Sequence, residues 1–565
     1  MAPEIMAVAH PDELSTATRT TPGTELLYHN DKDHAITTVE GYPIQYIERD
    51  DGCIILVPQP SPNDPNDPLR WPAWLKWSTF LNALSYSFMG GVTGPIMAAM
   101  MIPLSERFGQ TLQRMSYANG ATLVCQGVGN TLWMPLAIKF GRRPVYLASN
   151  TLMGIACIWL GVATNASYTP FIIGRAFLGL FEAPIESIVP STVTDIFFLH
   201  NRGARISMYG LSVLGGNELG PLFSAIIFQS LGSAWAFYIV AIFIFANSIT
   251  MFFFMPESRY LGARPTVSLA PSGPTPAAQA RDKGGVEMVE DVRETRPHAK
   301  TLVAAQKTSL GEVVPKQSFG RNLALWEAPD KNAGLAKDFL RPFILLTYPT
   351  VLWTCLIYGA SLGWNVILGA TVAQLFEPQY GFDSQAQGLV FLAPFVGSLV
   401  GTWLCGPMAD SIANYYTRLN DGVREPEMRL PTCAIAAALT TAGALVASLT
   451  YHYDTHWIGP IFGIGILGAG AQMGATLSMS YASDCHTDLI VELMVAVASL
   501  KSLIAWIWTW VINDWIAAQG MLVAFMTVAA INIVLYLTTI LLYIYGKRLR
   551  TWIHEHDMLA KAGLR

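Results

Sequence analysis

Five ionisable side chains lie inside stretches of the sequence that are otherwise almost entirely apolar. They are Arg175, Glu182 and Glu186 in one stretch, Glu218 in the next and Lys501 in a third. In a membrane such a charge costs about 2.5–3.5 kcal/mol even on the scale derived from helix insertion, so it is expected to face a protein interior or a wet cavity. A carboxyl group placed there can bind and release a proton, because desolvation favours its neutral form and a nearby cation favours its ionised form.

The spacing of the first group predicts that it occupies one face of a helix. Arg175 is followed by Gly179, Glu182 and Glu186 at steps of four, three and four residues, which repeat the period of an α-helix. Glu182, Glu218 and Lys501 each fall near the centre of their apolar stretch. Transporters place substrate and coupling-ion sites at this depth.

We rank Glu218 first and Glu182 second as candidates for a proton-binding residue, with Glu186 below them. The competing interpretation is structural. Arg175 can clamp its helix to a neighbouring helix, and Glu182 or Glu218 can each be held in a fixed pair with Arg175 or Lys501. Both interpretations remain open at this level.

Other polar and aromatic residues within the apolar stretches are candidates for substrate contacts, although each can equally join two helices. They are Asn82, Tyr86, Gln126, Asn217, Tyr358, Trp364, Asn365, Gln472 and Trp506.

The composition excludes several classes of protein. Of the 565 residues, 52% are hydrophobic and 13% are charged, whereas soluble domains carry about 25% charged residues. The net charge of −5 gives no indication of a nucleic-acid partner. The seven cysteines form no C-x-x-C motif, which argues against a disulfide framework and a zinc site, so no metal site is predicted. No nucleotide-binding G-x-x-x-x-G-K-[ST] motif occurs, and no enzymatic constellation is found.

The elements that must position the ionisable residues are membrane spans. A span needs about 20 apolar residues to cross roughly 30 Å of hydrocarbon. The predicted spans are 77–102, 117–138, 145–165, 170–195, 206–230, 235–256, 342–375, 388–409, 430–450, 457–482, 490–512 and 520–546. We therefore predict an all-α membrane protein with twelve transmembrane helices in two six-helix halves.

The polar segments between and around the spans divide the chain further. We expect a disordered cytoplasmic tail with an interfacial segment (1–70), a first half (71–256), a cytoplasmic linker (257–341), a second half (342–546) and a cytoplasmic tail (547–565). Similar sequences around Pro135 and Pro407, 272 residues apart, indicate an internal repeat.

The distribution of Lys and Arg predicts the orientation. The connections on the side of the N-terminus carry eleven Lys or Arg, and those on the other side carry only Arg107 and Arg114, which places both termini in the cytoplasm. We expect a multi-pass protein of the plasma membrane that acts as a monomer. Asn165-Ala166-Ser167 is a glycosylation sequon on the outer side.

Short motifs occur at the ends of spans and within them. Residues 139–144 read K-F-G-R-R-P, 174–179 read G-R-A-F-L-G, 215–221 read G-G-N-E-L-G-P, 256–258 read P-E-S and 406–410 read G-P-M-A-D. This ordered set resembles the signatures of the major facilitator superfamily. The first copy of the loop signature departs from the pattern because Ile138 stands where an Asp is expected, whereas the second copy keeps its acid as Asp410 but loses the basic end.

Further segments are similar to a fungal branch of that superfamily, the drug:proton antiporters, which includes polyamine and cation transporters and metabolite exporters. These segments are 56–61, 64–69, 235–238 and 378–382. The resemblance implies a major facilitator fold and a gate made by Gly141, Arg142, Arg143, Asp195 and Asp410. In that gate Asp195 and Asp410 are expected to pair with Arg142, Arg143 or Arg202.

The resemblance also implies a function. The chain is expected to be a secondary transporter that exports a small organic compound, a drug or a fungal metabolite, in exchange for protons. Its partners are then the small-molecule substrate, protons and the lipid bilayer, and the proton gradient takes the place of a cofactor as the energy source. The alternatives are a proton-coupled importer of a cation or polyamine and, less favoured, a nutrient sensor that transports nothing.

Overall fold

The computed structural model describes residues 23–26, 38–39, 42–43, 46–49, 52–56, 58–62, 64–262, 264, 315–325, 334–420, 423–486 and 489–564. Much of the expected tail (1–70) and linker (257–341) lies outside these residues. The part of the tail that is described forms five short strands and one 3-10 turn. They are β1 (Glu25–Leu26), β2 (Thr38–Val39), β3 (Tyr42–Pro43), β4 (Tyr46–Arg49), β5 (Gly52–Ile55) and η1 (Pro68–Arg70).

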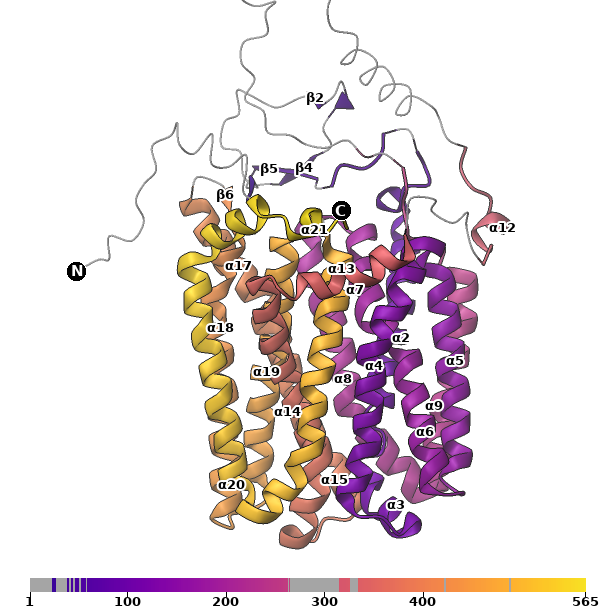
Figure 1. Cartoon of the computed structure of the whole chain (residues 1–565), viewed down its shortest axis with the longest axis vertical. Coiled ribbons are helices and arrows are strands. Elements are labelled where there is room, and N and C mark those ends of the chain that lie inside the picture. Colours follow the sequence, from indigo (N-terminus) through magenta and orange to yellow (C-terminus); the bar gives the residue numbers. More distant parts are fainter. Residues whose placement is uncertain are drawn as a thin grey trace, which may run out of the picture.

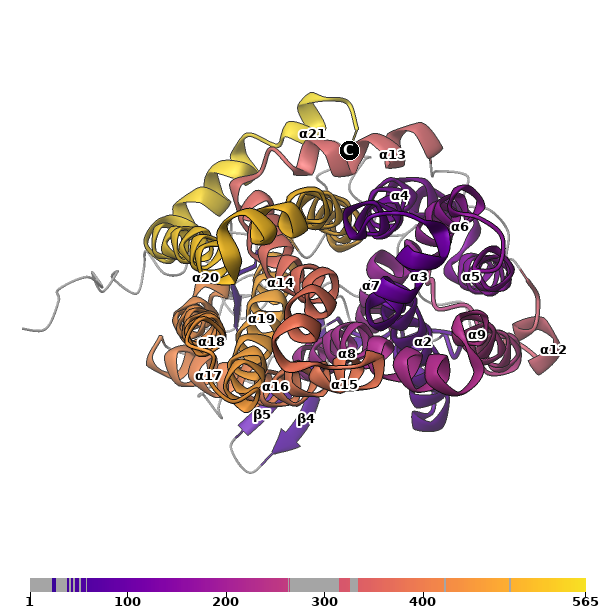
Figure 2. The same ribbon diagram turned by 90° about the horizontal axis from the view of Figure 1, so that it is seen from below.

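The first group of helices forms one of two bundles that stand side by side (Figures 1 and 2). Its elements are α2 (Ala73–Thr93), η2 (Ala98–Met100), α3 (Met101–Phe108), α4 (Leu112–Phe140), α5 (Arg142–Ala163), α6 (Tyr168–Glu182), α7 (Pro184–Ile196), α8 (Leu199–Leu231) and α9 (Ser233–Phe254).

The second bundle follows α12 (Phe319–Asn322) and α13 (Leu335–Leu345). It consists of α14 (Pro349–Tyr380), α15 (Ser384–Val390), α16 (Leu392–Trp403), η3 (Leu404–Met408), α17 (Ala409–Leu419), β6 (Val423–Arg424), η4 (Pro426–Thr432), α18 (Cys433–His452), α19 (Ile458–Cys485), α20 (Ile490–Glu555) and α21 (Met558–Lys561). We call the end of the bundles at which the strands, α12, α13 and α21 lie the terminal end (Figure 1).

The predicted count of twelve spans agrees with the structure. Nine helical segments in the described part of the chain are long and apolar enough to cross a membrane. Three more crossings come from α4, from α6 and α7 taken together, and from α20, which is interrupted at Gly520 (φ 81°, ψ 166°) and therefore contains two. The helices leave apolar side chains on their outer surface: Ile242, Phe243 and Ile249 of α9 are 56–61% exposed. An apolar outer surface is what contact with lipid requires.

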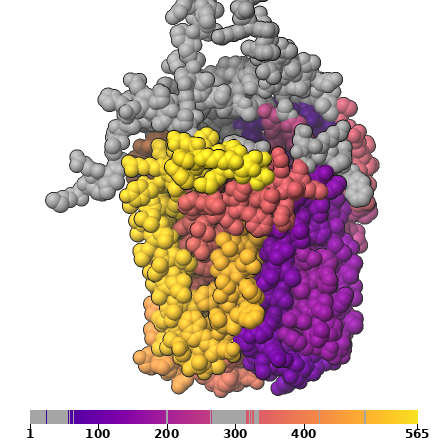
Figure 3. All heavy atoms as spheres, in the orientation of Figure 1, coloured from indigo at the N-terminus to yellow at the C-terminus, as the bar shows by residue number. Residues whose placement is uncertain are grey.

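The boundary between the bundles is crossed by α13 near the terminal end (Figure 3). This helix contacts α4 of the first bundle and α20 of the second. Arg341 fixes it there, because its guanidinium forms ion pairs with Asp338 of α13 and with Glu492 of α20, at 3.1 and 3.0 Å.

Glycines allow several helices to pack with their backbones in contact. A Cβ atom built on Gly443 of α18 would lie 2.3 Å from the backbone nitrogen of Leu467 in α19, and one built on Gly463 of α19 would lie 2.3 Å from that of Ala447 in α18. Small residues at such contacts are the usual means by which membrane helices associate, because lipid gives them little hydrophobic driving force.

This contact generates a stability prediction. Gly443→Ala should destabilise the protein by about 1–3 kcal/mol, because the added methyl group has no space between the two backbones. The apparent Tm of the purified protein in detergent measures the effect. Gly369→Ala in α14 is the matched control, because no heavy atom lies within 4 Å of its Cβ position, and it should leave Tm unchanged or raise it. Equal Tm values for the two variants would contradict the prediction.

Candidate functional site

A cavity lies between the two bundles, near the middles of α4, α8 and α14. It contains about 680 Å³ of space free of protein atoms, part of which is open to solvent. Its wall combines glycines, amides, two carboxyl groups and aliphatic side chains. The lining residues are Gly90, Gly91, Gly94, Pro95, Asn119, Thr122, Leu123, Gln126, Glu182, Ile185, Glu186, Val213, Asn217, Leu362, Asn365, Val366 and Gly369.

The two carboxyl groups stand on either side of the junction between α6 and α7. Pro184 begins α7 and has no N–H to donate to the carbonyl of Leu180 four residues earlier. Trp133 of α4 satisfies that carbonyl instead, with its Nε1 2.8 Å from the oxygen. The junction is therefore held against α4, with Glu182 at the end of α6 and Glu186 in the first turn of α7.

Glu182 is buried, with 2% of its surface exposed. Its Oε2 accepts a hydrogen bond of 2.7 Å from the hydroxyl of Thr93 at the end of α2. The carboxyl group thus faces the cavity and is bonded to a neutral group rather than to a cation.

Arg175 joins three helices of the first bundle. Its guanidinium donates to the carbonyls of Thr93 and Gly94, at 2.7 and 2.6 Å, and to Oδ1 of Asn119 in α4, at 2.7 Å. The side chain is fully buried. This geometry agrees with the structural interpretation of Arg175, a clamp that fixes α6 to α2 and α4 beside the cavity.

Lys501 forms a charged contact between the bundles. Its Nζ lies 2.6 Å from Oε1 of Glu186, and both side chains are nearly inaccessible, at 1% and 6% exposure. The same Nζ lies 4.0 Å from the ring centroid of Tyr358 in α14, which adds a cation–π interaction. Lys501 therefore pairs with Glu186, the glutamate ranked third from the sequence, and not with Glu182 or Glu218.

Glu218 lies where α8 meets α16. Its Oε1 accepts a hydrogen bond of 2.7 Å from Ser398 of the second bundle. The group is 2% exposed, and none of the ion pairs within the described residues includes it. It does not line the cavity, although its neighbour Asn217 does.

Among the polar candidates for substrate contact, Gln126, Asn217 and Asn365 line the cavity. The others mainly join helices. Asn82 accepts from Thr250 of α9, Tyr86 bonds to Ser149 of α5, Gln472 donates to Thr402 of α16, and Trp364 packs edge-on against Phe525 of α20. Trp506 instead packs edge-on against Trp510 of its own helix, α20. Tyr358 contacts Lys501, whose Nζ lies 4.0 Å from the centroid of its ring.

Sequence reasoning missed Asn119 and Thr122 in the cavity wall and Thr93, the hydrogen-bond donor to Glu182. A signal for two of them was present: Asn119, Thr122 and Gln126 are spaced by three and four residues in α4, which places them on one helix face. Thr93 carried no such signal, because its role depends on Glu182 reaching it from another helix.

At the terminal end of the first bundle, Gly141 adopts φ 103°, a conformation that favours glycine. The backbone N–H groups of Arg142 and Arg143 both donate to the carboxylate of Glu257, at 3.0 Å each. This carboxylate therefore caps the start of α5, where it also complements the helix dipole. Arg142 forms an ion pair with Asp195, as the resemblance implied.

The expectation for Asp410 is wrong. Its carboxylate pairs within the second bundle, with Arg429 at 2.9 Å and Arg424 at 3.7 Å, rather than with Arg142, Arg143 or Arg202. The reason is local: Asp410 and both partners lie on the consecutive elements α17, β6 and η4. Arg429 also pairs with Asp484 at the end of α19, at 2.9 Å.

Asn165 lies at the end opposite to the terminal end, after α5. Its side chain is exposed, and its Oδ1 accepts a hydrogen bond of 2.7 Å from Arg107.

The ion pair between the bundles generates a prediction. Lys501→Met should destabilise the protein by about 3–5 kcal/mol, because the carboxylate of Glu186 is left buried without its cation. Lys501→Met combined with Glu186→Gln should recover part of this loss. Lys547→Met is the control, because that lysine is 51% exposed in its pair with Glu425 and should cost at most about 1 kcal/mol. The apparent Tm in detergent is measured, and a double variant less stable than Lys501→Met would contradict the assignment.

Known proteins with similar sequences include fungal transporters. The chain is 25% identical over 550 residues to an MFS-type transporter of Schizosaccharomyces pombe, a match that covers 94% of this chain and 93% of the relative. It is 26% identical to Protein HOL1 of Saccharomyces cerevisiae, with 88% and 90% covered, and 26% identical to the MFS-type transporter penM of Penicillium rubens, with 88% and 89% covered.

Solved structures with the same fold are also transporters. A D-xylose-proton symporter matches with a TM-score of 0.56 at 12% identity, over 82% of this chain and 97% of the symporter. The human organic anion transporter MFSD10 matches with a TM-score of 0.52 at 16% identity, over 83% and 100%. The family model of the Major Facilitator Superfamily matches residues 77–508. The fold, the cavity between two helix bundles and this match together establish that the chain belongs to the Major Facilitator Superfamily.

Proposed function

We propose that this transporter exports a small organic compound in exchange for protons, by alternating access of the central cavity to the two sides of the membrane. The observation that carries the proposal is the ion pair that joins Glu186, a residue of the cavity wall, to Lys501 of the other bundle. A site of this kind, at mid-depth between two repeats, changes its exposure when one bundle rocks against the other. The pair must then break or rearrange as the bundles move.

Two other carboxyl groups support proton coupling. Glu218 is buried at a contact between the bundles and has a hydroxyl rather than a cation as its partner, and Glu182 has the same kind of partner beside the cavity. Burial without a cation favours the neutral form of a carboxyl group. A movement that separates α8 from α16 would hydrate Glu218 and favour loss of its proton, which couples protonation to conformation.

The cavity wall also defines what the substrate can be. Glu182, Glu186 and the amides of Asn119, Gln126 and Asn365 offer hydrogen bonds, while aliphatic side chains and glycines supply most of the remaining wall. A small compound with both polar and apolar parts fits this lining. The acidic groups also favour the second candidate function, a proton-coupled importer of a cation or polyamine. A sensor that transports nothing is the least favoured alternative.

We further propose that the terminal end faces the cytoplasm and that the membrane is the plasma membrane of a fungal cell. The excess of Lys and Arg in the connections at that end supports this orientation. Asn165 then lies outside, where its exposed side chain is accessible to glycosylation. The protein is proposed to act as a monomer.

Uptake into inside-out vesicles with an acidic interior tests the function. Polyamines, azoles and small fungal metabolites would be screened with the wild-type protein, Glu218→Gln and Glu182→Gln. We expect the wild type to accumulate a compound against its gradient, and Glu218→Gln to lose accumulation while still exchanging labelled for unlabelled compound. The expected loss is about tenfold or more, because a glutamine cannot exchange the proton that drives the cycle.

Glu555→Gln is the control for this measurement, since that exposed residue lies at the end of α20, and it should accumulate the compound normally. Loss of accumulation in Glu182→Gln alone would move the coupling role to Glu182. Wild-type vesicles that accumulate nothing, in cells that take the same compound up, would contradict export in favour of import.

A further inference from the structure

One face of α8 connects the central cavity to a pocket at the terminal end. Val213 and Asn217 line the central cavity, and Ser207 and Gly203, about two and three turns before Val213, line a smaller pocket. Gly203 also lines the pocket at the terminal end, which contains about 550 Å³ of space free of protein atoms. The spacing of these residues follows the helix period, so they mark a continuous line along the boundary between the bundles.

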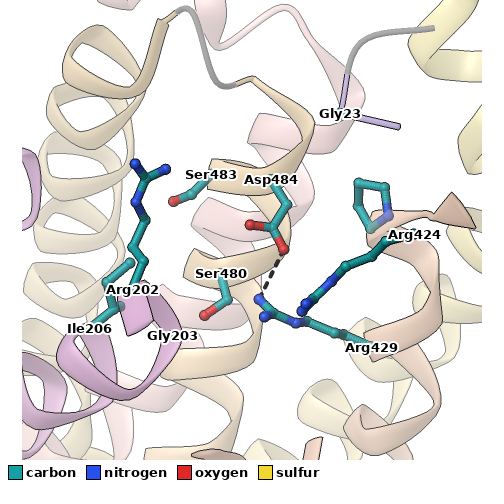
Figure 4. A pocket seen from close by; sticks show the side chains of 10 residues that line it. Gly23, Arg202, Gly203, Ile206, Arg424, Arg429, Ser480, Ser483 and Asp484 are labelled. Atoms are coloured by element: carbon teal, nitrogen blue, oxygen red, sulfur yellow. Dashed lines mark hydrogen bonds and ion pairs between the residues drawn. The ribbon is translucent and has the colours of Figure 1, made fainter. Parts of the chain in front are cut away.

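The pocket at the terminal end is built by both bundles, and we call it the terminal pocket (Figure 4). The first bundle contributes the start of α8 with Arg202, and the second contributes Arg429 of η4 and the end of α19 with Ser483 and Asp484. Between this pocket and the central cavity, α8 lies close to α19: a Cβ on Gly210 would be 3.3 Å from both Gln472 and Thr476. The two helices therefore close the path between the pockets at Gly210. The terminal pocket lies on the terminal side of this contact, and we call it the mouth of the path.

A segment far from both bundles in sequence also lines this mouth. Gly23 is a lining residue, although the first helix of the first bundle begins only at Ala73. Gly23 has φ 80°, and a Cβ built on it would lie 2.4 Å from the carbonyl oxygen of Asp484 and 3.3 Å from Cα of Cys485. Its backbone is thus packed directly on the end of α19, at a position where only glycine fits.

Two further contacts hold the same segment on the second bundle. Strand β1 (Glu25–Leu26) pairs antiparallel with β6 (Val423–Arg424), with Glu25 opposite Arg424. The hydroxyl of Thr24 accepts a hydrogen bond of 3.4 Å from Arg550 after the last span. Backbone pairing, close packing and a side-chain contact therefore place residues 23–26 at the mouth.

The contacts of this segment decide how it can act. They are made with the second bundle, to β6, to the end of α19 and to Arg550 of α20. These contacts do not tie the two bundles together. It can only act where it is docked, by occupying the mouth.

We propose that residues 23–26 are an autoinhibitory segment that covers the terminal mouth of the translocation pathway. With the segment docked, a substrate cannot enter between α8 and α19 from the terminal end. When it detaches, the mouth becomes accessible. The inference rests on the chain being a transporter, but not on proton coupling or on the direction of transport.

The test measures access to the mouth without any substrate. Ser483→Cys places a thiol on the pocket wall, and its reaction with a water-soluble maleimide is followed on the purified full-length protein in lipid nanodiscs. The parent chain gives the background of the native cysteines. Adding Gly23→Val, which cannot pack against Asp484, should raise the labelling rate about three-fold, the gain expected if the docked segment closes the mouth in about two-thirds of molecules. A chain that lacks residues 1–26 should show the same increase.

Gly563→Val is the matched control. Gly563 also has positive φ (68°) and lies at the same end of the molecule, but no heavy atom lies within 4 Å of its Cβ position, so labelling of the introduced thiol should not change. Labelling rates that are equal with and without Gly23→Val and with and without residues 1–26 would overturn the proposal. So would faster labelling with no gain in initial transport rate, because the segment would then cover the mouth without inhibiting. A protein that transports nothing in any form would fail the proposed function, while the labelling rates would still decide whether the mouth is covered.

Discussion

Polar groups inside a membrane protein must find partners within the protein, because hydrocarbon offers none. The junction between α6 and α7 follows from this constraint. Pro184 leaves the carbonyl of Leu180 without its helical partner, and Trp133 supplies the missing donor. Arg175 donates from both terminal nitrogens of its guanidinium to carbonyls at the end of α2 and to Asn119 of α4. These contacts fix α6 and α7 against two neighbouring helices, so the carboxyl groups of the cavity wall stand at defined positions.

The charged contacts fall into two kinds with different consequences for motion. At the terminal end each bundle has its own network, with Arg142 and Asp195 in the first and Arg429 with two aspartates in the second. Pairs within one bundle stiffen it and move with it as a unit. The pair between Lys501 and Glu186 joins the bundles at the cavity, and an ion pair in a low-dielectric interior is costly to break unless both charges find new partners. Movement of one bundle against the other therefore requires new partners for both Lys501 and Glu186.

The sequence was sufficient to predict the elements and their common faces, but not which residues meet. Twelve spans and the shared helix face of Glu182 and Glu186 follow from apolar length and from spacing, which are properties of the chain itself. The partner of Lys501 could not be predicted, because the three glutamates lie on α6, α7 and α8, and the choice depends on which of these helices packs against α20 at Lys501. Asp410 was misassigned for a similar reason, since its partner Arg429 lies 19 residues further along the chain. The docking of Gly23 on Asp484 had no signal at all in the sequence, because it joins residues more than 400 positions apart.

The glycine motif of α8 shows how packing and function share residues. A Cβ on Gly216 would lie 2.4 Å from the carbonyl oxygen of Phe88 in α2, and one on Gly220 would lie 2.9 Å from that of Val92. The glycines therefore let α8 lie directly on α2, a role that does not depend on the direction of transport. Glu218 stands between them in sequence and so points away from α2, toward Ser398 of the other bundle. The motif thus places a buried carboxyl group at the contact between the two bundles, where a change in their separation alters its hydration, and the proposal of proton coupling depends on this placement.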